Sequence, residues 1–140
     1  MTEPLYTTEI LRLAASLDDP QELEREDGYA DVHSRTCGSR ISLAVQLDNE
    51  RRVERLSMRV EACAFGQASA ALLARHSKGR SHHEVSDAML ELSHWLADEQ
   101  AKTADWPGIA ALEPARAKRG RHGAILLPFR ALLAAMEAAG

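Results

Sequence analysis

Two stretches near the middle of the chain alternate between apolar and polar residues. Residues 39–47 and 53–61 carry this alternation, with the apolar positions at Ile41, Leu43, Val45, Leu47, Leu56, Met58 and Val60. A period of two is typical of strands with one buried and one solvated face. Asp48-Asn49-Glu50 supplies turn-forming residues between them. The pattern predicts an antiparallel hairpin, 39–47/53–61, and a further short strand is expected near 29–33.

Helical spacing marks four other segments. The apolar positions lie at Ile10, Leu13, Ala14 and Leu17; at Ala68, Ala71 and Leu72; at Val85, Met89, Leu92 and Leu96; and at Ile125, Phe129, Leu132, Leu133 and Met136. Ser81 and Glu84 fit a capping box before the third segment. Pro128 predicts that the last helix begins at 125–127, because proline fits best in a first turn.

The order of elements is a helix, then strands, then helices, which indicates an α+β fold. We expect a small antiparallel sheet packed against N-terminal, central and C-terminal helices. A length of 140 residues is sufficient for one core, so residues 1–140 are expected to form a single domain.

Composition and charge exclude several classes of function. The net charge of −4 argues against general nucleic-acid binding. No apolar run approaches the roughly 18 to 20 residues of a membrane span, and no basic start precedes an apolar segment as in a secretory signal. We therefore expect a soluble cytoplasmic protein that binds neither membrane nor nucleic acid, with cysteines present as reduced thiols.

The two cysteines are the strongest candidates for chemistry. Cys37 precedes the first strand of the hairpin, and Cys63 follows the second strand, directly before an alanine-rich helix. The hairpin would bring both to the same open end of the sheet. The positive end of a helix dipole favours a thiolate, which is a nucleophile or metal ligand. The alternative is that each cysteine is a small buried apolar residue, and no C-x-x-C motif decides between the two.

Thr36-Cys37-Gly38-Ser39, followed by the hairpin, Cys63, the alanine-rich helix and a C-terminal helix, resembles the NifU/IscU/SufU family of iron–sulfur cluster assembly scaffolds. Residues 121–132 resemble the family's last motif, and the long interval from Cys63 to Ala124 resembles its SufU-like subclass. The resemblance implies that Cys37 and Cys63 are cluster ligands. Ser39 stands where the family has an aspartate, and Ala124 where it has a third cysteine, so the ligand set is incomplete.

The resemblance leaves three functional hypotheses open. The first is a scaffold or carrier that transiently holds iron or a nascent cluster through Cys37 and Cys63, as a homodimer that brings four thiolates together. The second is a sulfur acceptor that takes a persulfide on Cys37, for which zinc is the alternative metal. The third is a metal-free protein-binding module. A carrier is favoured over a catalyst, and the implied partners are a cysteine desulfurase and apo iron–sulfur proteins.

The histidines and a basic run are the remaining candidates for functional residues. His122 lies two residues before Ala124, and it is either an additional metal ligand or a solvated loop residue. His82 and His83 fit surface positions beside a helix cap. A basic run stands out against the acidic chain, and it is either a solvated loop or a docking patch for an acidic partner. Its members are Arg116, Lys118, Arg119, Arg121 and His122. The L-P-P-V-K type segment through which short scaffolds are recognised by a dedicated chaperone is absent, which argues against that partner.

Overall fold

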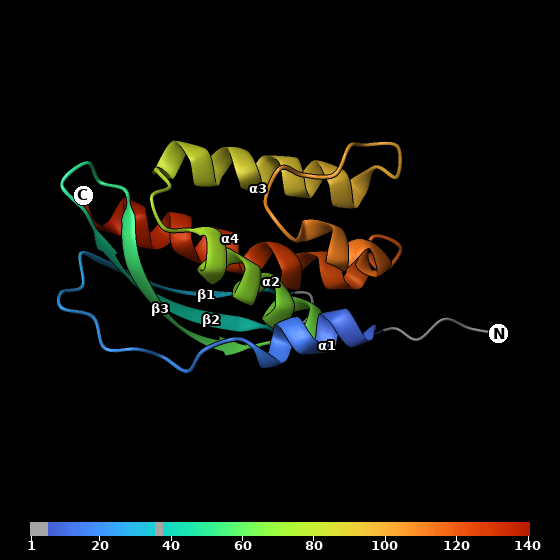
Figure 1. Ribbon diagram of the computed structural model, residues 1–140, viewed down its shortest axis with the longest axis horizontal. Coiled ribbons are helices and arrows are strands. Elements are labelled where there is room, and N and C mark those ends of the chain that lie inside the picture. Colours follow the sequence, from blue (N-terminus) through green and yellow to red (C-terminus); the bar gives the residue numbers. More distant parts are fainter. Residues whose placement is uncertain (1–5, 36–37) are drawn as a thin grey trace.

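Three antiparallel strands form a sheet in the order β1–β2–β3 in the computed structural model, which describes residues 6–35 and 38–140 (Figure 1). They are β1 (Gly28–His33), β2 (Arg40–Leu47) and β3 (Val53–Glu61). The predicted hairpin and the short strand before it are therefore confirmed, with bounds that differ by at most one residue.

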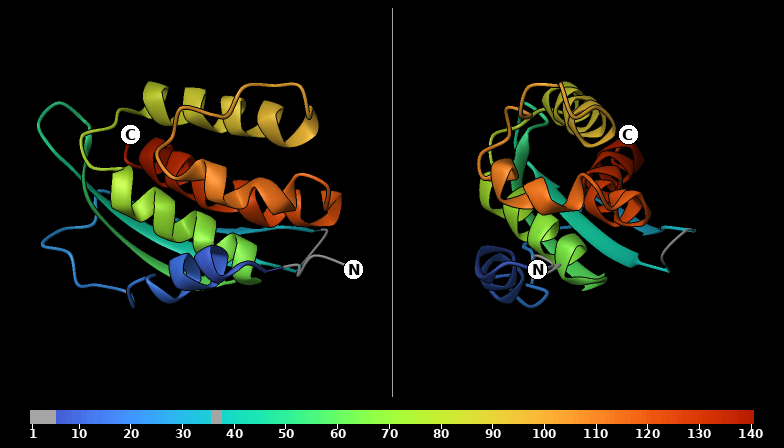
Figure 2. Two further views of the ribbon diagram at one scale, coloured as in Figure 1. Left: turned by 45° about the vertical axis from the view of Figure 1, so that its right-hand side comes forward. Right: turned by 90° about the vertical axis from the view of Figure 1, so that its right-hand side faces the viewer.

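Four α-helices and two short 3-10 helices occur in the described part of the chain. They are α1 (Thr8–Ala15), α2 (Ala64–His76), α3 (His82–Ala97), η1 (Ile109–Ala115), η2 (Arg119–Arg121) and α4 (His122–Ala138). α4 lies against β1 and β2, α2 packs on α4 and β3, α3 covers α4 from outside, and α1 packs on α2. Figure 2 shows α2, α3 and α4 on one side of the sheet. The α+β class is confirmed.

The core lies between the sheet and α4. Ile41, Leu43 and Val45 on the central strand are fully buried against helices, as the alternation predicts. α4 approaches β1 so closely that a Cβ on Gly28 would lie 1.8 Å from the Ala135 carbonyl oxygen. Only glycine permits this contact, which fixes how near α4 lies to the sheet.

The predicted start of the last helix is wrong. α4 begins at His122 rather than at 125–127, and Pro128 lies inside it. A proline there removes the N–H that would bond to the Ala124 carbonyl. That carbonyl oxygen lies 3.3 Å from the place a Cβ would occupy on Gly66 of α2. Burial of most of α4 against the sheet and α2 stabilises the additional turn despite the lost hydrogen bond.

The outer face of the sheet is partly covered, contrary to the expectation of one solvated face. Gln46 alternates with the strand residues that face the helices, yet only 2% of its surface is exposed. The acidic segment before β1 crosses it, and the Glu24 amide donates to Gln46 Oε1 at 3.1 Å. Gln46 Nε2 donates to Glu54 at 3.2 Å, so both ends of the buried amide are paired.

The β2–β3 hairpin is tied to the start of α3 through Glu84. The predicted capping box is present: the Glu84 amide donates to Ser81 Oγ at 3.2 Å, and the Ser81 amide donates to Glu84 Oε1 at 3.1 Å. Arg52 of the hairpin donates to the same carboxylate. The hydrogen bond from the Ser81 backbone, followed by that from Arg52, lowers the pKa of Glu84 from its ordinary value.

Candidate functional site

The thiol of Cys63 lies at the end of the sheet where the strands β1, β2 and β3 meet the start of α2. Arg40 pairs with His33 on one side and with Glu61 on the other, so this edge is shared by all three strands. Cys63 follows two residues later as the N-cap of α2, with extended backbone angles, and its thiol makes no capping hydrogen bond. The side chain is half-buried and in no disulfide.

Thr36 and Cys37 lie outside the described residues, so the predicted approach of Cys37 to Cys63 stays a prediction. The residues that flank them are held in a turn. The Ser34 amide donates to the Ser39 carbonyl at 2.8 Å, and the Gly38 amide donates to the Ser34 carbonyl at 3.1 Å. Gly38 is exposed and has a φ of 71°, a conformation that favours glycine. This turn joins β1 to β2 at the same edge as Cys63.

Ser39 and Ala124, the two positions predicted to depart from the family's ligands, are buried. Ser39 is 4% exposed, and Ala124 is fully buried in the first turn of α4. The Ala124 Cβ lies 3.3 Å from the place a Cβ would take on Gly66, which is three residues after Cys63. Ser69 Oγ also donates to the Ile125 carbonyl at 2.6 Å, which fixes α2 against α4. Ala124 therefore lies beside the first turn of the helix that Cys63 begins.

The His122 ring is hydrogen-bonded to backbone carbonyl groups. Its Nε2 lies 3.0 Å from the carbonyl oxygen of Ala115 and 3.0 Å from that of Arg116, so this nitrogen donates to the backbone at the end of η1. A metal ligand would have to be the other ring nitrogen. Among residues 6–35 and 38–140, no group of three or more His, Cys, Asp or Glu side chains is placed to hold a metal ion.

Other histidines occupy the surface. His82 Nε2 lies 3.4 Å from Glu137, and His83 Nε2 lies 3.2 Å from Asp87. Their side chains are 46% and 85% exposed, so any ion pair there is worth little. Both residues are in the first turn of α3, where the sequence predicts them.

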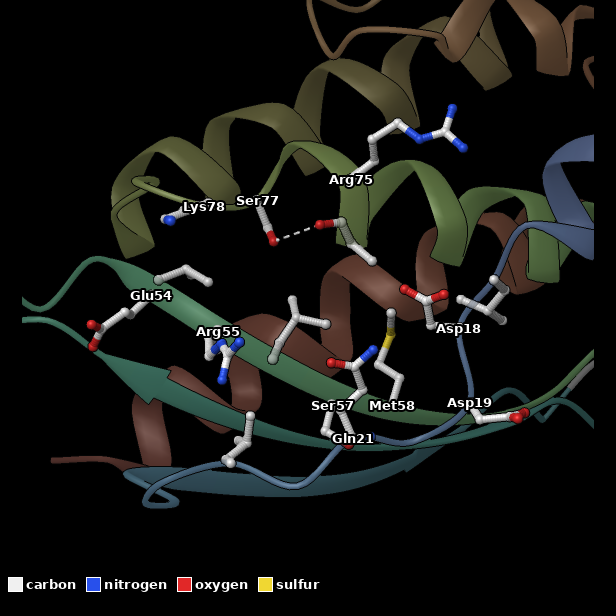
Figure 3. A pocket seen from close by; sticks show the side chains of 15 residues that line it. Asp18, Asp19, Gln21, Glu54, Arg55, Ser57, Met58, Arg75, Ser77 and Lys78 are labelled. Carbon is white, nitrogen blue, oxygen red and sulfur yellow. Dashed lines mark hydrogen bonds between the residues drawn. The ribbon is translucent and has the colours of Figure 1, made fainter.

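Two hollows lie near these elements. One of about 320 Å³ is bounded by β3, the end of α2 and residues 17–23, and Figure 3 shows Arg55, Asp18 and Met58 around it. It lies at the opposite end of α2 from Cys63. The other, of about 570 Å³, is shallow and lies beside the β1–β2 turn, with Arg35, Gly38 and Arg130 in its lining.

Comparison with known proteins decides the family. A model of the NifU-like N terminal domain matches residues 5–105. The chain belongs to this family. The predicted NifU/IscU/SufU resemblance is thus confirmed. The match stops before Ala124, so the correspondence of Ala124 with the third cysteine rests on the motif in residues 121–132 and not on the family model.

Solved structures extend the likeness to the whole chain. The crystal structure of a nitrogen-fixing NifU-like protein (N-terminal) from Brucella abortus is 28% identical, with 96% of this chain and 94% of that one covered and a TM-score of 0.82. A putative iron-sulfur cluster assembly scaffold protein for the SUF system from Fervidobacterium islandicum AW-1 is 17% identical, with coverage of 94% and 96% and a TM-score of 0.75, and shows the fold alone. A search of curated proteins finds no match.

Sequence reasoning missed the contribution of Gly66 to this site. A glycine inside a helix costs about 1 kcal/mol relative to alanine, so its presence three residues after Cys63 is a signal of close backbone approach. The structure shows the partner in that approach, which is Ala124 of α4.

The length and hydropathy of the helices bear on membrane insertion. Among the described residues, none of the helices is both long and apolar enough to cross a membrane.

Proposed function

We propose that residues 1–140 form one NifU-type domain that carries iron or a nascent iron–sulfur cluster during cluster assembly. The supporting observation is the position of Cys63, which is the N-cap of α2 and lies at the sheet edge where β1 ends and β2 begins. Two structural neighbours, a nitrogen-fixing NifU-like protein and a putative iron-sulfur cluster assembly scaffold protein for the SUF system, support this role.

The local chemistry suits an anionic sulfur ligand. The first amides of a helix have no partner within the helix, and the helix dipole places partial positive charge there. Cys63 occupies this place, so a sulfur of Cys63 bound to iron would lie beside these amides. The Cys63 residue is half-buried, so it is partly open to solvent.

The donor set fits a transient cargo better than a permanent one. Clusters are usually held by four thiolates, and this chain has two cysteines. Ser39 and Ala124 supply no thiolate, and the His122 ring is turned to the backbone. Two chains related by a two-fold axis would supply four thiolates to one shared cluster. A zinc site requires three or four protein ligands, and residues 6–35 and 38–140 present no group of three, so zinc is not part of the proposal.

A sulfur-acceptor role for Cys37 is the second candidate, favoured by the exposure of Gly38 beside it. In this step the Cys37 thiolate would attack the outer sulfur of a desulfurase persulfide. A new sulfur–sulfur bond would form on Cys37, the persulfide bond would break, and the desulfurase thiolate would leave with its electron pair.

Anaerobic reconstitution tests the carrier role. The purified protein is incubated with ferrous iron and sulfide, desalted, and analysed for iron, acid-labile sulfide, visible absorption and mass in solution. We expect one cluster for two chains and a dimer that forms only with the cluster. Cys63→Ser should abolish retention, while Ser93→Ala, an exposed change on α3 away from the site, should not.

Other outcomes contradict the proposal in different ways. Retention that is unchanged in Cys63→Ser would show that Cys63 is not a ligand. A parent protein that retains neither iron nor sulfide would support the metal-free binding module. Transfer of radiolabelled sulfur from a cysteine desulfurase to the parent, and not to Cys37→Ser, would support the acceptor role.

A further inference from the structure

Resting on the proposed function, we infer that three cations before α4 form a docking platform for an acidic surface of the sulfur-donating partner. This basic platform consists of Lys118, Arg119 and Arg121, and it is built around η2. The inference adds to the carrier role the surface through which the donor would be oriented toward the thiols.

The basic run in the sequence separates into two kinds of residue in the structure. Arg116 is structural: its Nε donates to the Trp95 carbonyl at 2.9 Å, its Nη2 donates to the Asp98 carbonyl at 2.6 Å, and its guanidinium lies 4.8 Å from the centre of the Trp95 ring. It also pairs with Glu113 at 3.1 Å, and its side chain is only 11% exposed. Arg116 is therefore unavailable to a partner.

Backbone hydrogen bonds and the His122 ring hold the loop that carries the platform. The Lys118 amide donates to the Ala115 carbonyl at 2.9 Å, and the Arg121 amide donates to the Lys118 carbonyl at 2.8 Å. His122 donates to the carbonyls of Ala115 and Arg116 from the other side. A backbone fixed in this way loses little further freedom when a partner binds, which lowers the entropic cost of docking.

The three platform side chains have no anion of their own. Within residues 6–35 and 38–140, Lys118, Arg119 and Arg121 form no ion pair, whereas Arg25, Arg40, Arg52 and Arg116 do. Lys118 and Arg119 are exposed, and Arg121 is half-exposed. The chain as a whole carries a net charge of −4, so this positive region contrasts with the rest of the surface.

The platform lies at the same end of the molecule as Cys63. Arg121 is the N-cap of α4, and Ala124 in the next turn packs beside Gly66. Gly66 is three residues from Cys63, or about 4.5 Å along the axis of α2. In Figure 1 the orange segment that precedes α4 lies at the same end as the start of α2. The positive end of the α4 dipole adds to the charge of the platform.

An acidic protein is the partner that this arrangement fits best. Complementary charge raises association rates from roughly 10⁵–10⁶ to as much as 10⁸–10⁹ M⁻¹s⁻¹ at low salt and orients the encounter. A negatively charged partner is repelled by the acidic remainder of the chain and attracted to one end, where Cys63 lies. The acidic segment at residues 18–27 leads into the opposite end of β1 and strengthens this polarity.

Stopped-flow association with a SUF-type cysteine desulfurase tests the platform. The triple variant Lys118→Glu, Arg119→Glu, Arg121→Glu is compared with a control that reverses three exposed cations elsewhere, Arg12→Glu, Arg55→Glu and Lys102→Glu, so that both variants have the same net charge. We expect the platform variant to associate at least about tenfold more slowly at low salt. The control should slow much less, and the difference should vanish near 0.5 M salt, where the screening length is only a few ångströms.

The outcomes separate this inference from the proposed function. If both triple variants slow equally, or the desulfurase does not bind the parent, the platform is wrong, while cluster retention with free sulfide still tests the carrier role by itself. If the platform variant alone slows but no cluster is retained, docking stands and the carrier role fails. Tighter binding of a DNA duplex than of the desulfurase, lost in the platform variant, would overturn the protein partner.

Discussion

Replacement of Gly66 by alanine tests the close approach of α2 and α4 beside Cys63. The added Cβ would lie 2.7 Å from the Ala62 Cβ and 3.3 Å from both the Cβ and the carbonyl oxygen of Ala124. The first distance is shorter than carbon atoms in proteins tolerate. Neither neighbour can rotate away, because each methyl group is fixed directly to the backbone. Either the connection between β3 and α2, which carries Ala62, or one of the two helices must therefore move.

The expected free-energy change has two opposing parts. Overpacking a buried site costs about 1–3 kcal/mol, and the rigid neighbours of Gly66 place this cost near the upper value. Alanine in place of glycine inside a helix stabilises it by about 1 kcal/mol. The net effect of Gly66→Ala is a loss of about 2 kcal/mol, which for a domain of this size lowers the melting temperature by roughly 8 °C.

Urea unfolding followed by circular dichroism measures this change. Gly120→Ala is the matched control, because a Cβ on Gly120 has no atom within 4 Å, so it should leave stability unchanged or raise it slightly. In the double variant Ala62→Gly, Gly66→Ala the shortest contact is removed, and the loss should be smaller than the sum of the single losses. A Gly66→Ala protein as stable as its parent would refute the close packing at this site.

Three further outcomes are expected. Because hydrogen bonds in the folded state lower the pKa of Glu84, the unfolded state binds more protons in acid. The stability that Glu84 contributes at neutral pH is therefore lost as the pH falls below its ordinary pKa and through the folded value. Glu84→Gln should flatten the dependence of unfolding free energy on pH across this acid range. Ala124→Cys should raise iron retention, whereas Ala131→Cys, two turns further along α4, should not; equal retention in both would show that the motif in residues 121–132 is misaligned. Native alkylation followed by mass spectrometry should label Cys37 before the half-buried Cys63, and the reverse order would assign the more reactive role to Cys63.

The local patterns of the sequence determined the elements. The alternation around Leu43 and Met58 predicts two strands that the structure pairs directly with each other. Ser81 and Glu84 predict the start of α3 because a capping box is a contact between residues three apart. The position of Cys63 before an alanine-rich helix likewise predicts its place as an N-cap. Each of these features depends on neighbours close in sequence, which is why pattern alone suffices.

Only the tertiary structure decided features that depend on contacts between distant segments. The interior position of Pro128 is tolerated because α4 is buried against the sheet and α2, and no local rule contains that burial. Gln46 is covered by a segment about twenty residues earlier in the chain. His122 and Arg116 lie in one basic run, yet the structure turns both toward the backbone. A charge pattern reports which side chains are ionic, whereas their availability to a partner depends on which carbonyls and rings the fold brings within reach.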